Sequence, residues 1–313
     1  MIKHGSALIL VALVASVAIG CTSSPAAITA PAAPTEAATT TAVAPTPAPP
    51  TATPAPPPDT PVPPPAALPP EPAPVEFEAA DGQALQGLYY PAASDSAPLL
   101  VLVHWVGGDQ HDWVEIAHWL QNRGLGGKGE KSAPWLDPSW FPPVPADQSL
   151  AVFTFSLRGC DESGCDNWTP DLWLLDAQAA MQAASELEGI DPQRIAAIGA
   201  SIGADGAIDG CQWLNERQGQ AQCAGALSLS PGNYFDVPYA GAVAALDAEK
   251  HPAWCLASEG DAESAPTCRS ATGDAYRMII YEGNAHGMML LKPGLDPDTL
   301  ETVLDFLALV FGT

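Results

Sequence analysis

The sequence predicts an α/β fold: a three-layer α/β/α sandwich with a mostly parallel sheet, preceded by a disordered tether. Uninterrupted apolar runs such as residues 99–103 are typical of strands buried on both faces of a parallel sheet. These runs alternate along the chain with amphipathic helical patterns, which would cover the two faces. The alternation occupies residues 76–313, and 238 residues is a length that a single α/β domain reaches.

Residues 1–20 have the composition of an export signal. Lys3 is followed by the apolar run ALILVALVASVAIG, which is shorter than the roughly 20 residues needed to cross a membrane. The run ends in Ala18-Ile19-Gly20-Cys21, which resembles the lipobox of bacterial lipoproteins, with Ala18 where that family usually has leucine. The resemblance implies a signal peptide at 1–20, a lipid on Cys21 and an exported, membrane-anchored protein. An ordinary cleaved signal is the alternative.

Residues 21–75 form the predicted linker, which begins at the cysteine to be lipidated. After Cys21 the segment consists almost entirely of proline, alanine, threonine and serine. Such a composition buries too little apolar surface to offset the entropy of ordering the chain. Its prolines favour extended polyproline-II geometry, so the segment is expected to act as a semi-rigid spacer.

The charge of the chain excludes one class of partner. The net charge is −25, and residues 76–313 carry 33 acidic and 10 basic residues. Nucleic acid is therefore not an expected partner, because phosphate binding needs a basic face. The acidity favours solubility, and no cluster of basic residues points to an anionic substrate.

Seven cysteines are present, and six remain when Cys21 is set aside for lipid. An even number in an exported protein predicts disulfides, and the cysteines fall into three pairs that are close in sequence: Cys160 with Cys165, Cys211 with Cys223, and Cys255 with Cys268. Other connectivities are open, and local pairing is the favoured one. A zinc site is the rival, but the sequence has no CxxC spacing, so no metal is expected.

The elements follow from local patterns. Val75–Leu88 predicts a hairpin that turns at Asp81-Gly82. Further strands are expected at 99–103, 150–155, 194–198, 226–229, 253–257 and 278–281, and helices from Trp113 to Gly124, from Thr169-Pro170 to Leu187, at 202–216, and from Asp296-Pro297 to Phe311. The long segment 124–149 is typical of a lid or binding loop. This segment contains Trp135 and Trp140, and Trp168 and Trp173 lie beyond the next strand. These tryptophans would cover a hydrophobic acyl site, provide a flat aromatic surface that binds a sugar, or simply pack onto the core.

The stretch Gly199-Ala200-Ser201-Ile202-Gly203 is the strongest chemical signal. A GxSxG pentapeptide that follows a strand and opens a helix is typical of a nucleophile elbow, a turn too tight for side chains two positions before and after the serine. Ser201 would then project at a helix N-terminus, where backbone N–H groups favour a developing anion.

A serine nucleophile needs a base and a carboxylate to orient that base. His286 lies in a loop just after the predicted strand 278–281, whereas His251 precedes its strand and lies at the opposite edge. Asp261 follows the strand 253–257, with Glu259 and Glu263 as rival acids. The chain order serine, acid, histidine is that of α/β-hydrolases.

Three stretches resemble this superfamily over residues 76–313, closest to its esterase and dienelactone-hydrolase-like branch. VLVHWVGGDQHDW is similar to the His-Gly oxyanion loop, LRGCDESG to the Arg-Gly-x-Gly-x-Ser stretch, and NAHG to the catalytic histidine loop. The resemblance implies oxyanion donors at the N–H of Ile202 and at that of Val106 or Trp105, with a structural role for His104. Trp105 and Cys160 each replace a usual glycine, and the serine replaces the cysteine nucleophile of true dienelactone hydrolases.

These features predict an exported serine hydrolase that cleaves small-molecule carboxylic esters through Ser201, His286 and Asp261, with no cofactor and no metal. The same machinery acting on amide or peptide bonds is one alternative. A non-catalytic surface binding domain on a hydrolase scaffold is another. Acyl-chain length and oligomeric state do not follow from the sequence.

Overall fold

The computed structural model describes residues 69–123, 138–145, 149–217, 219, 221–235 and 237–312. The predicted signal peptide, Cys21 and the linker as far as residue 68 lie outside the described residues, as do Gly124 and Trp135. Within the described part, no helix is long and apolar enough to span a bilayer.

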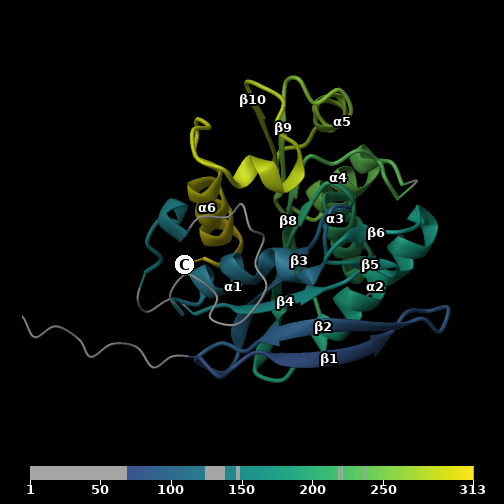
Figure 1. Ribbon diagram of the computed structural model, residues 1–313, viewed down its shortest axis with the longest axis vertical. Helices are drawn as coiled ribbons and strands as arrows, with labels where there is room; N and C mark the ends of the chain where they lie inside the picture. Colours follow the sequence, from purple (N-terminus) through teal and green to yellow (C-terminus); the bar gives the residue numbers. More distant parts are fainter. Residues whose placement is uncertain are drawn as a thin grey trace, which may run out of the picture. The chain divides into compact units, whose positions relative to one another are not determined.

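In the described residues, eight strands form one sheet in the order β1-β2-β4-β3-β7-β8-β9-β10 (Figure 1). The strands are β1 (Ala73–Glu78), β2 (Ala84–Tyr90), β3 (Ala97–Val103), β4 (Ala151–Phe155), β7 (Ile190–Ala200), β8 (Cys223–Leu229), β9 (Ala253–Ser258) and β10 (Tyr276–Tyr281). The β1–β2 hairpin and the β2–β4 pair are antiparallel, and the other neighbours run parallel. The predicted mostly parallel sheet is therefore confirmed.

Helices cover both faces of the sheet and define two apolar layers. The helices are α1 (Val114–Leu120), α2 (Pro170–Ser185), α3 (Ile202–Glu216), α4 (Tyr239–Ala248), α5 (Ser264–Ser270) and α6 (Thr299–Phe311). Side chains of α2 to α5 pack in one layer with Val101 of β3, and side chains of α1 and α6 pack in the other with Leu102. Because successive strand residues point to opposite faces, the continuous apolar run of β3 supplies both layers.

Element boundaries differ from the expected ones in a few places. Strand β1 begins at Ala73, inside the predicted linker, because it pairs along its length with β2. Helix α6 begins at Thr299 and not at Asp296-Pro297, since the Asp298 side chain accepts hydrogen bonds from the first backbone N–H groups of the helix. The helix predicted from Trp113 to Gly124 is a 3-10 turn, η1 (Gln110–Trp113), followed by the seven residues of α1.

Two helices of the described residues were not predicted from the sequence. Helix α4, with the sequence YAGAVAALDA, consists mostly of small apolar residues and has no clear polar face, so its periodicity is weak. Helix α5 has seven residues, SAPTCRS, with a proline inside it. Helix α4 packs beside α3, and α5 packs beside α4 and β9 on the same face of the sheet, where tertiary contacts outweigh local propensity.

The described residues contain disulfides between Cys160 and Cys165, Cys211 and Cys223, and Cys255 and Cys268. These are the three local pairs favoured from the sequence. The first closes a small antiparallel hairpin of β5 (Cys160–Asp161) and β6 (Gly164–Cys165), and the others join α3 to β8 and β9 to α5. Three disulfides in one domain indicate an oxidising, extracytoplasmic compartment.

Helix α3 carries two buried carboxyl groups behind the serine. Asp205 is 1% exposed and accepts a hydrogen bond from the Gly232 N–H at 3.0 Å, whereas Asp209 is 5% exposed and its two oxygens have no hydrogen-bond partner among the described residues. Burial and, to a lesser degree, the neighbouring Asp205 raise the pKa of Asp209 to about 8. Burial likewise raises the pKa of Asp205 to about 7, against hydrogen bonds from backbone N–H groups.

These buried acids predict that the fold loses stability as the pH rises. The folded protein holds the Asp209 proton up to about pH 8, whereas the unfolded chain releases it near pH 4. The stabilisation is complete below about pH 4 and is lost as the pH rises toward the folded pKa, by at most about 1.4 kcal/mol per pH unit for this group. In Asp209→Asn, the melting temperature should therefore fall less than in wild type between pH 5 and pH 8. Thermal unfolding across this range measures the effect.

Asp171→Asn is the matched control, since Asp171 is an exposed aspartate on α2. This variant should follow the wild-type pH dependence. A wild-type pH dependence in Asp209→Asn would contradict the prediction.

Candidate active site

The loops at the carboxyl edge of the sheet bring the predicted site residues together. Ser201 follows β7 directly, Asp261 lies in the loop after β9, and His286 lies in the loop after β10. The loop that begins at His104 follows β3, the neighbour of β7. Because parallel strands end at the same edge, segments far apart in the sequence meet there.

Ser201 occupies a backbone conformation that few residues adopt. Its φ is 53° and its ψ is −120°, a geometry that costs on the order of 1–3 kcal/mol and occurs mainly at functional sites. The Ser201 N–H donates to the Leu229 carbonyl of β8 at 2.8 Å, and the Ala204 N–H donates to the Ser201 carbonyl at 2.8 Å. These bonds hold the turn that joins β7 to α3.

Gly199 and Gly203 let helix α3 begin in direct contact with the sheet. A Cβ on Gly199 would lie 1.7 Å from the Gly203 carbonyl oxygen. A Cβ on Gly203 would lie 2.3 Å from the carbonyl oxygen of Val103 and 2.4 Å from that of His104. Since the opposing atoms belong to the backbone and cannot turn away, neither position accepts a side chain. The glycine spacing around the serine follows from this packing.

A chain of hydrogen bonds links the serine to a carboxylate through the histidine. His286 Nε2 lies 2.8 Å from Ser201 Oγ, and His286 Nδ1 lies 2.7 Å from Asp261 Oδ2. An ionised Asp261 accepts from Nδ1–H, which leaves Nε2 free to accept from the serine hydroxyl. The geometry therefore suits removal of the Ser201 proton by the imidazole.

The surroundings of Asp261 keep it ionised. Burial raises its pKa, but the hydrogen bond to His286 and those from Ser264 outweigh burial and hold the pKa below its usual value. The second carboxylate oxygen accepts from the Ser264 N–H at 3.1 Å and from the Glu263 N–H at 3.4 Å. These bonds fix the carboxylate opposite the imidazole.

The rival acids have other partners. Glu259 forms an ion pair with Arg269, and Glu263 accepts a hydrogen bond from a tyrosine hydroxyl at 3.3 Å. Of the three carboxylates in this loop, the one bonded to His286 is Asp261. The sequence alone left this choice open, because all three lie within five residues.

The other histidines of the domain have different surroundings. His251 lies before β9, and its Nε2 is 2.9 Å from the side-chain nitrogen of Gln222. His111 Nδ1 lies 3.0 Å from Asp109, and the His118 ring makes an edge contact with an aromatic ring of the core. His251 is thus at the opposite edge of the sheet, as its place in the sequence indicated.

His104 is buried and neutral. Its Nε2 accepts from the Leu157 N–H at 3.0 Å, so Nδ1 carries the proton and donates to the Trp105 carbonyl at 2.7 Å. Burial lowers the pKa of His104 to about 4. These contacts agree with the supporting role that the family resemblance implied.

Two backbone segments offer donors to an oxyanion. The Ile202 N–H is at the first position of α3, where the backbone donor has no partner within the helix. Val106 and Trp105 lie on the loop after β3, and Val106 is 38% exposed. Both Ser201 and the Trp105 indole border Gly287: a Cβ there would lie 3.1 Å from the indole and 3.4 Å from the Ser201 Cβ. The loop after β3 therefore borders the nucleophile.

A pocket of about 460 Å³ opens beside His286. Its walls are mostly apolar, with one cation, and are formed by Trp105, Asn284, Ala285, His286, Met289, Lys292, Pro293, Gly294 and Leu295. The segment after the histidine loop supplies most of this lining. No signal in the sequence indicated this lining, because that segment carries no motif and its position depends on the packing of η3 (Gly287–Leu291).

Two of the four tryptophans singled out in the sequence pack onto the core, which was one of the three roles considered for them. Trp173 is fully buried and its Nε1–H donates to the Arg158 carbonyl at 3.0 Å, and Trp140 packs against the layer of α1 and α6. Trp168 is 57% exposed and makes an edge contact with Trp173. Within the described residues, no three potential metal ligands come together.

Comparisons with known proteins place these features in context. No family model matches the sequence. YfhR of Escherichia coli K12, an uncharacterized protein, is 30% identical over 139 residues, or 43% of this chain. The match spans 40% of the length of YfhR.

Solved structures of similar fold cover most of the described domain. Esterase Pf2001 of Pyrococcus furiosus has a TM-score of 0.51 at 16% identity, over 76% of this chain and 92% of the esterase. The α/β hydrolase GrgF of Penicillium sp. sh18 has a TM-score of 0.53 at 15% identity, over 78% and 100%. A dienelactone hydrolase of Anabaena variabilis has a TM-score of 0.50 at 14% identity, over 77% and 97%. Together with the sheet order and the strand–serine–helix turn, these similarities show that the chain has the α/β-hydrolase fold.

Proposed function

We propose that this protein is a serine hydrolase that cleaves carboxylic esters with Ser201 as nucleophile. The observation that carries the proposal is the continuous hydrogen-bond chain from Ser201 Oγ through His286 to Asp261. The serine of this chain sits on a strained turn at the N-terminus of α3, where backbone donors favour negative charge. A binding domain would have no use for such an arrangement.

The residues would act in two half-reactions. Ser201 Oγ attacks the ester carbonyl carbon while His286 Nε2 takes the hydroxyl proton, and the N–H groups of Ile202 and of Val106 or Trp105 hold the oxyanion. Collapse of the tetrahedral intermediate expels the alcohol, which receives the proton from His286. Water, deprotonated by His286, then attacks the acyl carbon, and the acid is released as Ser201 Oγ takes the proton back from His286. Asp261 orients the imidazole and stabilises its charged form throughout.

The substrate side of the proposal rests on the pocket and on the similar structures. A mostly apolar pocket of about 460 Å³ beside His286 suits a small-molecule acyl or alcohol group. Two proteins of similar fold are an esterase and a dienelactone hydrolase. In our proposal the protein is also exported and tethered through a lipid on Cys21. Export would place the domain in an oxidising compartment, and its three disulfides support such a location.

A fluorophosphonate probe tests the nucleophile. Wild-type protein should be labelled and should hydrolyse short p-nitrophenyl esters. Ser201→Ala should lose labelling and about 10³-fold or more of kcat/KM, because the attacking oxygen is gone. Labelling of Ser201→Ala at the wild-type rate would show that another residue is the reactive nucleophile, and no labelling of wild type would favour the non-catalytic binding domain.

Replacement of the acids tests the role of Asp261. Asp261→Asn should lower kcat by about 10²–10⁴-fold, because an amide stabilises neither the productive tautomer nor the imidazolium. Glu259→Gln and Glu263→Gln are matched controls from the same loop and should keep kcat within about threefold. Initial rates and melting temperatures measured on all three variants separate catalysis from stability. Equal losses in the three variants would rule out a specific role for Asp261.

The choice between ester and amide bonds depends on relative turnover. The proposal expects p-nitrophenyl esters to be cleaved with a kcat/KM at least about 10³-fold above that of matched peptide anilides. Comparable values for the two series would establish the amide or peptide alternative, which uses the same residues.

A further inference from the structure

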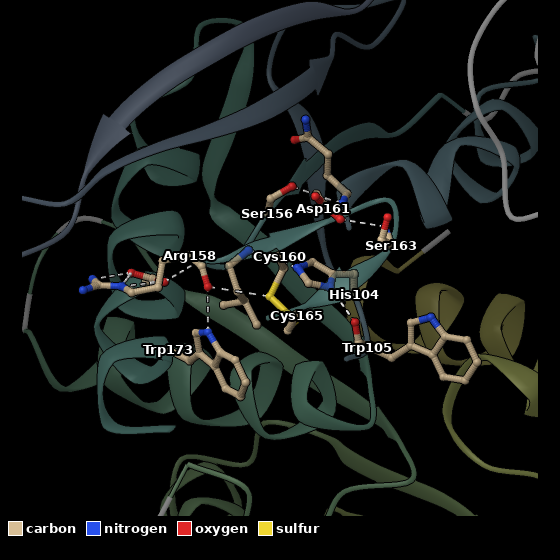
Figure 2. Close-up of a disulfide and its surroundings, with 12 residues drawn as sticks. His104, Trp105, Ser156, Arg158, Cys160, Asp161, Ser163, Cys165 and Trp173 are labelled. Atoms are coloured by element: carbon tan, nitrogen blue, oxygen red, sulfur yellow. Dashed lines mark hydrogen bonds and ion pairs between the residues drawn. A yellow bond between two sulfur atoms is a disulfide. The ribbon is translucent and has the colours of Figure 1, made fainter. Parts of the chain in front are cut away.

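We infer that the Cys160–Cys165 hairpin positions the oxyanion loop, defined here as residues 105–107, and that the Val106 N–H is the second oxyanion donor. This inference rests on the proposed function and deepens it. The hairpin lies in the stretch where the resemblance to α/β-hydrolases breaks down, since Cys160 stands where a glycine is usual. Figure 2 shows the disulfide with His104 and Trp105 in its surroundings.

The hairpin contacts the oxyanion loop through its backbone. The Cys165 N–H donates to the Val106 carbonyl at 3.0 Å. Gly164 lies directly beneath the same carbonyl: a Cβ on Gly164 would lie 2.9 Å from the Val106 oxygen and 3.6 Å from the Gly107 Cα. The peptide plane between Val106 and Gly107 is therefore held by one hydrogen bond and by close packing.

His104 holds the adjacent peptide plane. Its Nδ1–H donates to the Trp105 carbonyl at 2.7 Å (Figure 2). In a trans peptide the N–H of the next residue points opposite to the carbonyl, so this bond also fixes the direction of the Val106 N–H. Both peptide planes that flank Val106 are thus restrained, which is why we assign Val106, in preference to Trp105, as the donor.

The two restraints come from one segment, residues 157–165. Leu157 donates its N–H to His104 Nε2 at 3.0 Å, and Cys165 contacts Val106. Between them, Arg158 forms an ion pair with the buried Asp176 of α2 at 2.6 Å, and its carbonyl accepts from the Trp173 indole at 3.0 Å (Figure 2). The base of the hairpin is therefore anchored to helix α2.

The disulfide is needed because the hairpin is small. Strands β5 and β6 have two residues each, and such short pairs are not stable by themselves. The crosslink joins the paired residues Cys160 and Cys165, next to the bond from the Asp166 N–H to the Gly159 carbonyl at 2.9 Å. By restricting the open forms of the hairpin, it keeps the Cys165 N–H in place beneath Val106.

Two glycines of the same hairpin give a matched test. Gly164 and Gly159 both have positive φ, +107° and +71°, so alanine strains the backbone at either position. A Cβ on Gly159 meets no atom within 4 Å, whereas a Cβ on Gly164 meets the Val106 carbonyl. Gly164→Ala should therefore lower kcat about 10-fold or more with KM within about twofold, and Gly159→Ala should keep kcat within about threefold at a similar loss of melting temperature.

A second pair of variants removes the crosslink itself. Cys160→Ser/Cys165→Ser should lower kcat with little change in KM. Cys211→Ser/Cys223→Ser is the control, because that disulfide joins α3 to the start of β8, at the opposite edge of the sheet. The control should lose melting temperature and keep kcat. All rates are measured well below the melting temperature of each variant.

The inhibition constant of a phenylboronic acid, which forms a tetrahedral adduct with the serine, distinguishes positioning from general stability. It should rise in Gly164→Ala by the factor by which kcat/KM falls, because both report the oxyanion contacts. Wild-type kcat and boronate affinity in Gly164→Ala and in the Cys160/Cys165 variant would overturn the inference while the proposed function stood. Wild-type protein that neither hydrolyses esters nor reacts with a fluorophosphonate would overturn both.

Discussion

The close approach of helix α3 to the backbones of β7 and β3 is the contact on which the site depends. At Gly199 and Gly203 the chains meet with no room for a Cβ, and Ser201 between them takes up a strained conformation as a result. The strain is tolerated because backbone hydrogen bonds to β8 and within α3 surround the turn. The same approach brings the carbonyl of His104, and with it the loop after β3, against the start of α3. One packing constraint therefore sets the position of the proposed nucleophile, of the first proposed oxyanion donor and of the loop that carries the second.

The parts of the site that lie on loops are held by local polar contacts. Asp261 is fixed by backbone N–H groups at the start of α5, and the loop that contains it is closed by the Cys255–Cys268 disulfide. The oxyanion loop is fixed by His104 and by the Cys160–Cys165 hairpin. Ion pairs can hold only a few of these loops, because residues 76–313 carry 33 acidic and only 10 basic side chains. Disulfides and backbone hydrogen bonds hold most of the site loops in place.

Helix α3 contributes both to the candidate site and to the pH dependence of the fold's stability. Its N-terminus faces the site, whereas Asp205 and Asp209 lie buried further along, with pKa values raised by burial. Asp205 ties the loop after β8 to the helix through the Gly232 N–H. Asp209 has no such partner among the described residues, and it weakens the fold whenever it ionises. The helix that presents the nucleophile is thus also the place where the stability of the domain is sensitive to pH.

The sequence by itself determined the sheet, the turn between β7 and α3, and which serine and histidine we propose as nucleophile and base. These follow from local rules: apolar runs make buried strands, GxSxG between a strand and a helix makes the turn, and a histidine just after a strand reaches the same edge. The tertiary structure decided which carboxylate of three meets His286, that Trp140 and Trp173 pack into the core, and that the Cys160–Cys165 hairpin lies beneath Val106. It also decided that α4 and α5 are helical. Each of these outcomes depends on contacts between residues far apart in the chain, for which local periodicity and spacing carry no signal.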